Sequence, residues 1–596
     1  MARDTDTPVV SNYARYWEAP FNRPEAYPIA QELDPAHYRP LGPWMGRLVL
    51  PTIQERARVR GTWLELYHAP ETHRALVGTR VRLRWADTPD LNARLWGVTR
   101  TVVFNDEAWE AVRKGIVLGE RLHGLSNVNP LESLAGAHAN DDILVRLDGA
   151  VQVELQPPDG HEPVVVIRRM PVEISAPYYA LVRFAGPASV ADGYTVHHYN
   201  AATADFSGPE EVLYLPEVVP DSNETRNSTA AGIECSPCNA QGWYIYGARD
   251  RQGRLVVRAL AARQVLRLNP QVAVVVGTSD AMDYLRPRQW KRAAARGEAT
   301  QALLVPDGIH PDAARAAWQE GDRVLLIHLY GGIGGKKTEP AARTPLYWGH
   351  FAFGVATVIH EPLANELGFD IVYNQVYAHN ADGMTAGALH YSRYSGDRQY
   401  GWAGVRPIQD LLVKIDALSG AFSIWGTEVT ALEEIERQLE VMEARYRIAD
   451  GRGGTRVGAL NNCAQDGAQA LYAAVRTVGR ILGARADVRA EMSDTPEEAQ
   501  RLKALQELGD EIQRVLLPWG AAREDWEYSV ASLGSEGGGI FGTIGDAVKS
   551  WRTMLPPVAA RSLAEVFLDH GGAIYVLRTY QVGGNDPDVE PIVPNI

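Results

Sequence analysis

Short strand patterns separated by turns dominate the chain up to about residue 305. Arg80–Trp85 alternates polar and apolar residues, as a strand with one buried face does. Val164–Ile167 is a continuous β-branched run, and turn pairs such as Asp159-Gly160 separate runs of this kind. Helical patterns join the strands later in the chain, at 309–319, 430–446, 463–482 and 494–516. The sequence therefore predicts an α+β fold.

The chain length predicts a multidomain protein. It has 596 residues, and a domain typically takes roughly 150 residues. Changes of pattern divide the chain into an irregular arm, two β-rich modules, a mixed domain with an insertion at about 380–455, and a helical C-terminal region. We expect these parts at 1–40, 41–160, 161–305, 310–482 and 483–596, respectively.

Composition excludes some partners and compartments. The net charge of −14 argues against a large nucleic-acid-binding surface, which needs an excess of Lys and Arg. Three cysteines are too few for a disulfide framework, which favours a reducing compartment. No apolar run approaches the roughly 20 residues of a membrane-spanning helix, and the first residues do not resemble a signal peptide. We expect a cytoplasmic protein without an integral membrane segment.

The clearest catalytic pattern lies between residues 320 and 480. Strand patterns cover 324–329, 347–356 and 369–379, and Cys463 opens an apolar helix. A nucleophilic thiol needs a lowered pKa and a base for its proton. A helix N-terminus supplies free N–H groups that stabilise both a thiolate and an oxyanion, and His350 on the second strand supplies the base. The pattern therefore predicts Cys463 as nucleophile and His350 as general base.

A third polar group normally orients the imidazole of such a pair. If the second and third strands form a hairpin in which 359 pairs with 370, His350 lies opposite His379. Opposed residues of an antiparallel pair share a face and have Cβ atoms about 4.5–5.5 Å apart. This register predicts that His379 orients His350, and a shift of the register would remove the contact.

These residues resemble a known family. Gly321-Asp322 before a strand, Gly349–Val355 around the histidine, and Asn462-Cys463 on a helix are similar to the circularly permuted branch of the NlpC/papain-like cysteine enzymes, which includes the lecithin:retinol acyltransferase-like proteins. The resemblance covers about 310–482 and implies a papain-like α+β domain there. It also implies catalytic roles for His350, His379 and Cys463.

The whole chain is also similar to long, mostly cyanobacterial proteins labelled as predicted Abi/CAAX-type proteases. The similar segments are Tyr330–Gly335, His350–Gly354, Asn461–Asp466 and Arg578–Gly584. This second resemblance implies a proteolytic activity.

Other interpretations of the same residues remain open. Cys463 is also compatible with a buried core thiol, because free cysteines are among the most buried residues. The protein would then be a scaffold or binding protein with a decayed papain-like domain. A cluster of histidines between 328 and 390 allows a metal-dependent hydrolase, although no tight ligand spacing occurs.

Two further motifs predict irregular structure. The Gly-rich segment 331–338 departs from the P-loop pattern and predicts a flexible loop. Cys235–Cys238 is a lone CxxC that predicts a surface turn.

The function expected from the sequence is that of a cysteine-dependent hydrolase or acyl transferase. Cys463 would attack the carbonyl of an amide, ester or thioester in a peptide, lipid or small acyl substrate, and no cofactor is implied. Long segments without structure are rare in compact domains and are usually functional. We therefore expect the segment between His379 and Cys463 to form a lid or specificity element, with a helix around Leu432, Ile435, Leu439 and Met442.

Overall fold

The fold is described from a computed structural model of the full chain. The structure describes residues 11–106, 109, 119–222, 224–226, 228–290, 297–339, 347–376, 384–401, 405–424, 427–448, 463–484, 496–516, 555–580 and 588–595. Helices and strands both contribute heavily and the strands form several sheets, so the predicted α+β multidomain class is confirmed.

One mixed sheet of 15 strands runs through the molecule. Its central part consists of strands from residue 273 onward, in the spatial order β14-β15-β24-β21-β16-β18-β19-β20. The bounds of these strands are β14 (Ala273–Val276), β15 (Ala299–Val305), β24 (Ala573–Thr579), β21 (Ile408–Lys414), β16 (Arg323–Tyr330), β18 (His350–Glu361), β19 (Glu366–Gln375) and β20 (Gly387–His390). Most neighbours here are antiparallel, and β16 lies in the middle between β18 and β21.

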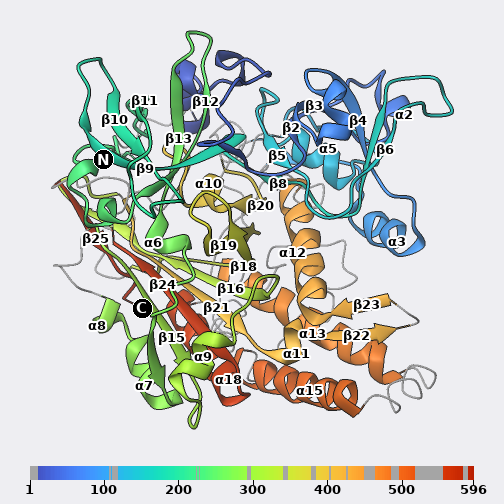
Figure 1. The fold of residues 1–596 in the computed structure, drawn as a ribbon. Helices are drawn as coiled ribbons and strands as arrows, with labels where there is room; N and C mark the ends of the chain where they lie inside the picture. The colour runs from blue at the N-terminus through green and yellow to red at the C-terminus, as the bar shows by residue number, and fades with distance from the viewer. Residues whose placement is uncertain are drawn as a thin grey trace, which may run out of the picture.

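The same sheet continues into an N-terminal module, drawn in blue in Figure 1. Strand β8 pairs with β20 and joins the two halves. The module has its own apolar core. Its strands are β2 (Met45–Val49), β3 (Thr62–His68), β4 (Arg80–Trp85), β5 (Leu144–Arg146), β6 (Gln152–Glu154), β7 (Val164–Ile167) and β8 (Val172–Glu173), with helices α1 (Asn12–Tyr16), α2 (Arg56–Val59), α3 (Pro89–Val98) and α5 (Pro130–Ala135).

A second sheet of 6 strands packs on one face of the central sheet. Its strands close on themselves because β9 pairs with both β10 and β12. Buried apolar side chains of this sheet and of the central sheet form one continuous core. The strands are β1 (Arg39–Pro40), β9 (Tyr178–Pro187), β10 (Gly193–His198), β11 (Glu210–Tyr214), β12 (Trp243–Arg249) and β13 (Leu255–Ala262).

Long helices cover the opposite face of the central sheet, as the orange and red segments of Figure 1 show. They are α12 (Ala431–Ile448), α13 (Cys463–Ala484), α15 (Pro496–Leu516) and α18 (Pro556–Asp569). Three of them match the helical patterns found in the sequence. Their apolar residues and those of β16, β18 and β21 form one continuous core. Shorter helices join the elements: α6 (Arg263–Leu266), α7 (Thr278–Tyr284), α8 (Pro287–Trp290), α9 (Pro311–Ala316), α10 (Tyr391–Tyr394) and α11 (Asp416–Ser419).

The segment expected to be a lid belongs to the core instead, so that prediction is wrong. Strand β21 comes from this segment and lies between β16 and β24 in the sheet. The helix predicted within it is α12, but its apolar face, including Leu432, Ile435, Leu439 and Met442, is buried against the sheet and α13. A long insertion is stable here because it carries the apolar surface that completes the sheet.

The sheet also crosses the expected domain boundaries at 305 and 483. Strand β15 precedes the first boundary, and β24 lies in the C-terminal region that was expected to be helical. The two pair with each other, and β24 pairs with β21 on its other side. Residues on both sides of each boundary therefore contribute to one sheet.

Two short sheets lie outside these layers. Strand β17 (Gly332–Gly335) pairs with β25 (Val589–Ile592), so the Gly-rich segment predicted to be a flexible loop contains a strand. Glycine is required at position 331 because the two backbones lie close together there. A Cβ on Gly331 would lie 2.0 Å from the carbonyl oxygen of Ile592. Strands β22 (Ala421–Ile424) and β23 (Thr427–Thr430) form the other pair.

Candidate active site

The candidate nucleophile lies at the N-terminal end of a helix that packs directly on the sheet. Cys463 is the first residue of α13, and Gly467 follows it by about one turn on the same side of the helix. A Cβ on Gly467 would lie 3.0 Å from Cδ2 of Phe353 on β18. The glycine therefore allows the first turn of α13 to approach β18 closely, which brings Cys463 to the start of that strand.

Backbone N–H groups surround the thiol. Burial raises the pKa of the Cys463 thiol to about 11, and Asp466 raises it as well, whereas hydrogen bonds from the N–H groups of Phe351, Ala464 and Cys463 itself lower it. The side chain remains half-buried. At neutral pH the resting group is therefore a thiol, but the donors that would stabilise a thiolate or an oxyanion are already in position.

His350 directly precedes Phe351, the strand residue whose N–H binds the thiol. Its Nε2 lies 3.0 Å from Oε1 of Gln375 on β19, and both side chains are buried. An amide oxygen only accepts hydrogen bonds, so Nε2 carries the proton and Nδ1 carries the lone pair of the neutral ring. The ring also packs on Tyr330 of β16, with 4.9 Å between the ring centroids. Gln375 and Tyr330 thus hold an imidazole in the tautomer that a base requires.

The sequence missed Gln375 because the predicted register is wrong by two residues. The hairpin of β18 and β19 is confirmed, but Glu361 pairs with Glu366 and Phe353 with Asn374, so that 359 lies opposite 368 rather than 370. His379 lies outside the described residues, as does Asn462 of the Asn-Cys pair. The shifted register makes Gln375 a diagonal neighbour of His350 on the same face of the sheet.

Two buried tyrosines interact electrostatically with the thiol. Cys463 contributes to the raised pKa of both Tyr330 and Tyr394, for which burial is the main cause. The described site therefore contains a thiol, backbone donors, an oriented imidazole and phenol groups, which together are sufficient for acyl transfer if the thiol proton can be removed.

Three of the histidines that suggested a metal site have separate partners. His328 binds Asp410, His360 binds Asn365, and His390 lies 3.2 Å from Asp370. Among the described residues, no group of three or more His, Cys, Asp or Glu side chains is arranged to hold a metal ion.

The other two cysteines lie in a turn of two short 3-10 helices, Ile233–Cys235 and Pro237–Ala240. Cys235 is exposed, whereas Cys238 is buried and its thiol donates to the carbonyl oxygen of Gly297. Burial raises the pKa of Cys238 to about 12. The predicted turn is present, but Cys238 is fully buried, so the prediction that the whole segment lies at the surface is wrong.

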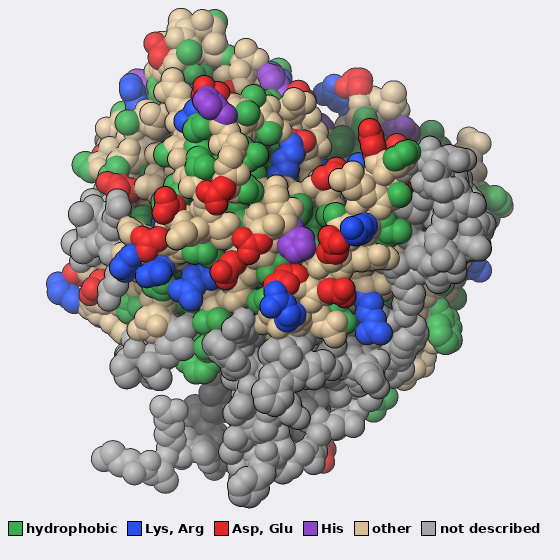
Figure 2. Space-filling view, turned by 90° about the horizontal axis from the view of Figure 1, so that it is seen from below, with side chains coloured by type: hydrophobic (Ala, Val, Ile, Leu, Met, Phe, Trp, Pro, Cys, Tyr) green, Lys and Arg blue, Asp and Glu red, His purple; other side chains and the backbone are tan. Residues whose placement is uncertain are grey.

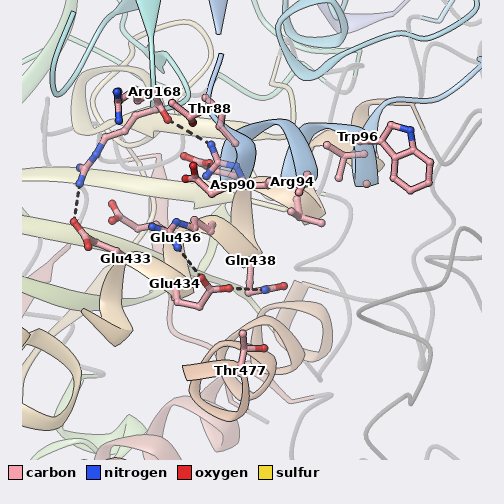
Figure 3. Close-up of a pocket in the computed structure, with 18 of the residues that line it drawn as sticks. Thr88, Asp90, Arg94, Trp96, Arg168, Glu433, Glu434, Glu436, Gln438 and Thr477 are labelled. Atoms are coloured by element: carbon pink, nitrogen blue, oxygen red, sulfur yellow. Dashed lines mark hydrogen bonds and ion pairs between the residues drawn. The ribbon is translucent and has the colours of Figure 1, made fainter. Parts of the chain in front are cut away.

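A pocket of about 840 Å³ lies between α3 and α12, away from Cys463 (Figure 3). Its lining is rich in charges that neutralise one another: Arg94 pairs with Glu440, Arg169 with Glu433, and Arg437 with Glu434. Figure 2 shows a similar mixture of acidic and basic side chains on the described part of another face. Neither surface identifies a ligand by its charge.

Two further results bear on the class of protein. In the part of the chain that the structure describes, no helix has the length and apolar character needed to cross a membrane. Comparison of the chain with protein-family models, with curated proteins and with solved structures gives no match.

Proposed function

We propose that the protein is a cysteine-dependent hydrolase or acyl transferase that acts on an amide, ester or thioester. The observation that carries this proposal is the surroundings of Cys463: it is the first residue of α13, and the backbone N–H groups of Phe351 on β18 and of Ala464 lower the pKa of its thiol. His350 immediately precedes Phe351 on β18, and the side-chain amide of Gln375 orients its ring. A thiol, an imidazole and an orienting amide are the groups of a Cys-His-Asn type of site.

The chemistry assigned to each group follows from its hydrogen-bonding capacity. Cys463 attacks the carbonyl carbon of the substrate and forms an acyl-enzyme. The N–H groups of Phe351 and Ala464, which bind the thiol in the resting protein, stabilise the negative charge that develops. His350 acts as general base through Nδ1, and Gln375 keeps its tautomer.

A panel of activated aryl esters, thioesters and peptide anilides tests the proposal. We expect turnover of at least one class, its loss in Cys463→Ala and in His350→Ala, and no effect of a chelator. Cys235→Ala is the matched control, because Cys235 is an exposed thiol without this environment. Turnover that survives Cys463→Ala would refute the assignment, and turnover lost with the chelator would favour a metal-dependent hydrolase. A protein without turnover whose Cys463 is chemically inert would favour the scaffold or binding role.

A further inference from the structure

A second cavity, of about 770 Å³, lies in the N-terminal module on the outer face of its sheet. Its floor belongs to β4, β6 and β7, and its walls are α2 with its C-cap and the segment 156–161. Arg82 and Arg84 of β4 line the floor, whereas Leu83 between them belongs to the apolar core of the module. The cavity has the size of a site for a small organic ligand.

The lining of this cavity is positively charged, although the chain as a whole is acidic. Four arginines line the cavity together with two carboxylates, whereas the net charge of the chain is −14. The charged lining residues are Arg58, Arg60, Arg82, Arg84, Glu154 and Asp159. A positive lining of this kind on an acidic protein attracts small anions to the cavity.

Two of the arginines are fixed by carboxylates and shape the cavity. Arg82 is buried and lies 2.6 Å from Asp159, and it also donates to the carbonyl oxygen of Glu162. Arg58 lies 2.6 Å from the Glu162 carboxylate and over the ring of Trp63. These contacts hold the floor and one wall in place before a ligand arrives, which lowers the cost of binding.

The other two arginines have N–H groups that remain open. Within the part of the chain that the structure describes, the side chain of Arg60 forms no hydrogen bond or ion pair, and Arg84 donates to Glu154 through one Nη atom alone. A guanidinium carries five N–H donors in a planar fork, and this fork matches the oxygens of a phosphate or carboxylate. Arg60 and Arg84 therefore keep donors for an anionic ligand.

The backbone conformation of Arg60 indicates that its side chain has a role. Arg60 is the C-cap of α2 and has a φ of 53°. Glycine is the usual residue in this left-handed conformation at a helix end, because a Cβ is unfavourable there. Strained residues of this kind cluster at ligand sites. An arginine at this position, with its side chain on a cavity and without a partner among the described residues, fits a contact to a ligand.

We propose that this cavity binds a small organic phosphate through Arg60 and Arg84. A phosphate fits two guanidinium groups better than a carboxylate does, because it offers more negative charge and more acceptor oxygens. The organic part of the ligand packs on the apolar lining, which includes Val59, Pro158 and Val164. This site goes beyond the proposed acyl transfer, since α13 with the candidate nucleophile lies in another part of the molecule (Figure 1).

Isothermal titration calorimetry of the full chain with phenyl phosphate tests this proposal. We expect saturable binding of one phenyl phosphate per chain, and binding of phenylacetate and of inorganic phosphate that is at least about tenfold weaker. Arg60→Gly is the decisive variant, because it removes the guanidinium and relieves the left-handed φ. It should fold normally in urea unfolding and bind phenyl phosphate at least about tenfold more weakly. Arg74→Ala is the matched control, because Arg74 is an exposed arginine of the same module outside the cavity.

Each of the other outcomes would overturn the proposal or a part of it. The absence of saturable binding of phenyl phosphate to the folded wild type would refute the site. Equal affinities of the wild type and a folded Arg60→Gly, or an equal loss in Arg74→Ala, would refute the assigned residues. Phenylacetate that binds as tightly as phenyl phosphate would refute the preference for phosphate, and inorganic phosphate that does so would refute the apolar subsite.

Discussion

Replacement of Gln375 by leucine tests the orientation of His350. The Gln375 side chain is 2% exposed and that of His350 6%, so water cannot take the place of the lost amide oxygen. Leucine is similar in size and removes the acceptor of the 3.0 Å bond from Nε2. A buried N–H that loses its acceptor costs about 1–3 kcal/mol. We expect the free energy of unfolding to fall by that amount.

The same change should affect catalysis more strongly than stability. A positioned general base contributes about 10²–10⁴ in rate, and a ring without its orienting partner loses part of that factor. We expect turnover of an aryl ester to fall at least about tenfold in Gln375→Leu.

Gln375→Glu separates orientation from charge. A carboxylate at this position still accepts from Nε2 but favours the imidazolium form, so it raises the pKa of His350 in the folded state above the unfolded value of about 6.5. The stability that this pair contributes is present below that pH and is lost as the pH rises through the folded-state pKa. We expect the stability of the Glu variant, relative to the wild type, to fall between about pH 6 and pH 9. The acid limb of its turnover profile should shift to higher pH.

Urea unfolding and ester turnover measured on the same samples provide the assay. Gln375→Leu that retains both the wild-type stability and the wild-type turnover would refute the role of this amide. A Glu variant whose stability follows the wild type at every pH would show that the residue at position 375 does not contact the ring.

Three further predictions concern the core and its buried charges. Leu439→Ala on α12 should lower the free energy of unfolding by about 2–5 kcal/mol, since Leu439 is fully buried; a loss near zero in thermal unfolding would restore the lid interpretation. Burial raises the pKa of Glu443 well above its usual value, so the folded state holds this proton and stability falls as the pH rises above about 4.3. Glu443→Gln should therefore gain stability over the wild type at about pH 8 but not at about pH 4, and urea midpoints that differ equally at both pH values would contradict this. Asp370→Asn removes the charge that lies 2.6 Å from buried Arg146, which still pairs with Asp148, and should cost about 1–3 kcal/mol in urea unfolding; a loss near zero would show that the pair is weak.

Local patterns in the sequence predicted three of the four long helices and many strands correctly. The apolar periodicity of α12 and α13 and the cap signals of α15 are properties of consecutive residues. The position of β24 in the sheet, in contrast, does not follow from consecutive residues. Its two sheet neighbours, β15 and β21, lie far away in the chain, and no local period encodes that pairing. Local patterns therefore do not indicate that residues on both sides of an expected boundary meet in one sheet.

The register error has an equally local cause that periodicity does not reveal. Glu361 closes a tight turn by accepting hydrogen bonds from the N–H groups of Leu363 and Ala364 with its side chain. Asn365 completes the turn at a φ of 53°, a conformation that asparagine tolerates better than most residues. The predicted pairing assumed a longer loop, so it selected a histidine where the structure has Gln375 beside His350.

Within the site, the sequence predicted the residue types of the central pair but not their surroundings. Cys463 at the start of α13 and His350 on β18 follow from motif and order along the chain. His328 and Tyr394 belong to strands and helices whose faces are set by the sheet order, and a single histidine in an apolar strand is usually a core residue. Only the pairing of β16 with β21 indicates that an aspartate lies beside it.

Trapping of the acyl-enzyme is the most direct test of the central claim that Cys463 is the nucleophile. The folded wild-type protein is mixed with an activated aryl ester, quenched in acid within the first turnover and digested for peptide mass mapping. The account predicts an acyl group on Cys463, whereas Cys235 and Cys238 remain unmodified. Acylation of Cys235 in preference to Cys463, or release of the aryl alcohol without any adduct on Cys463, would contradict it.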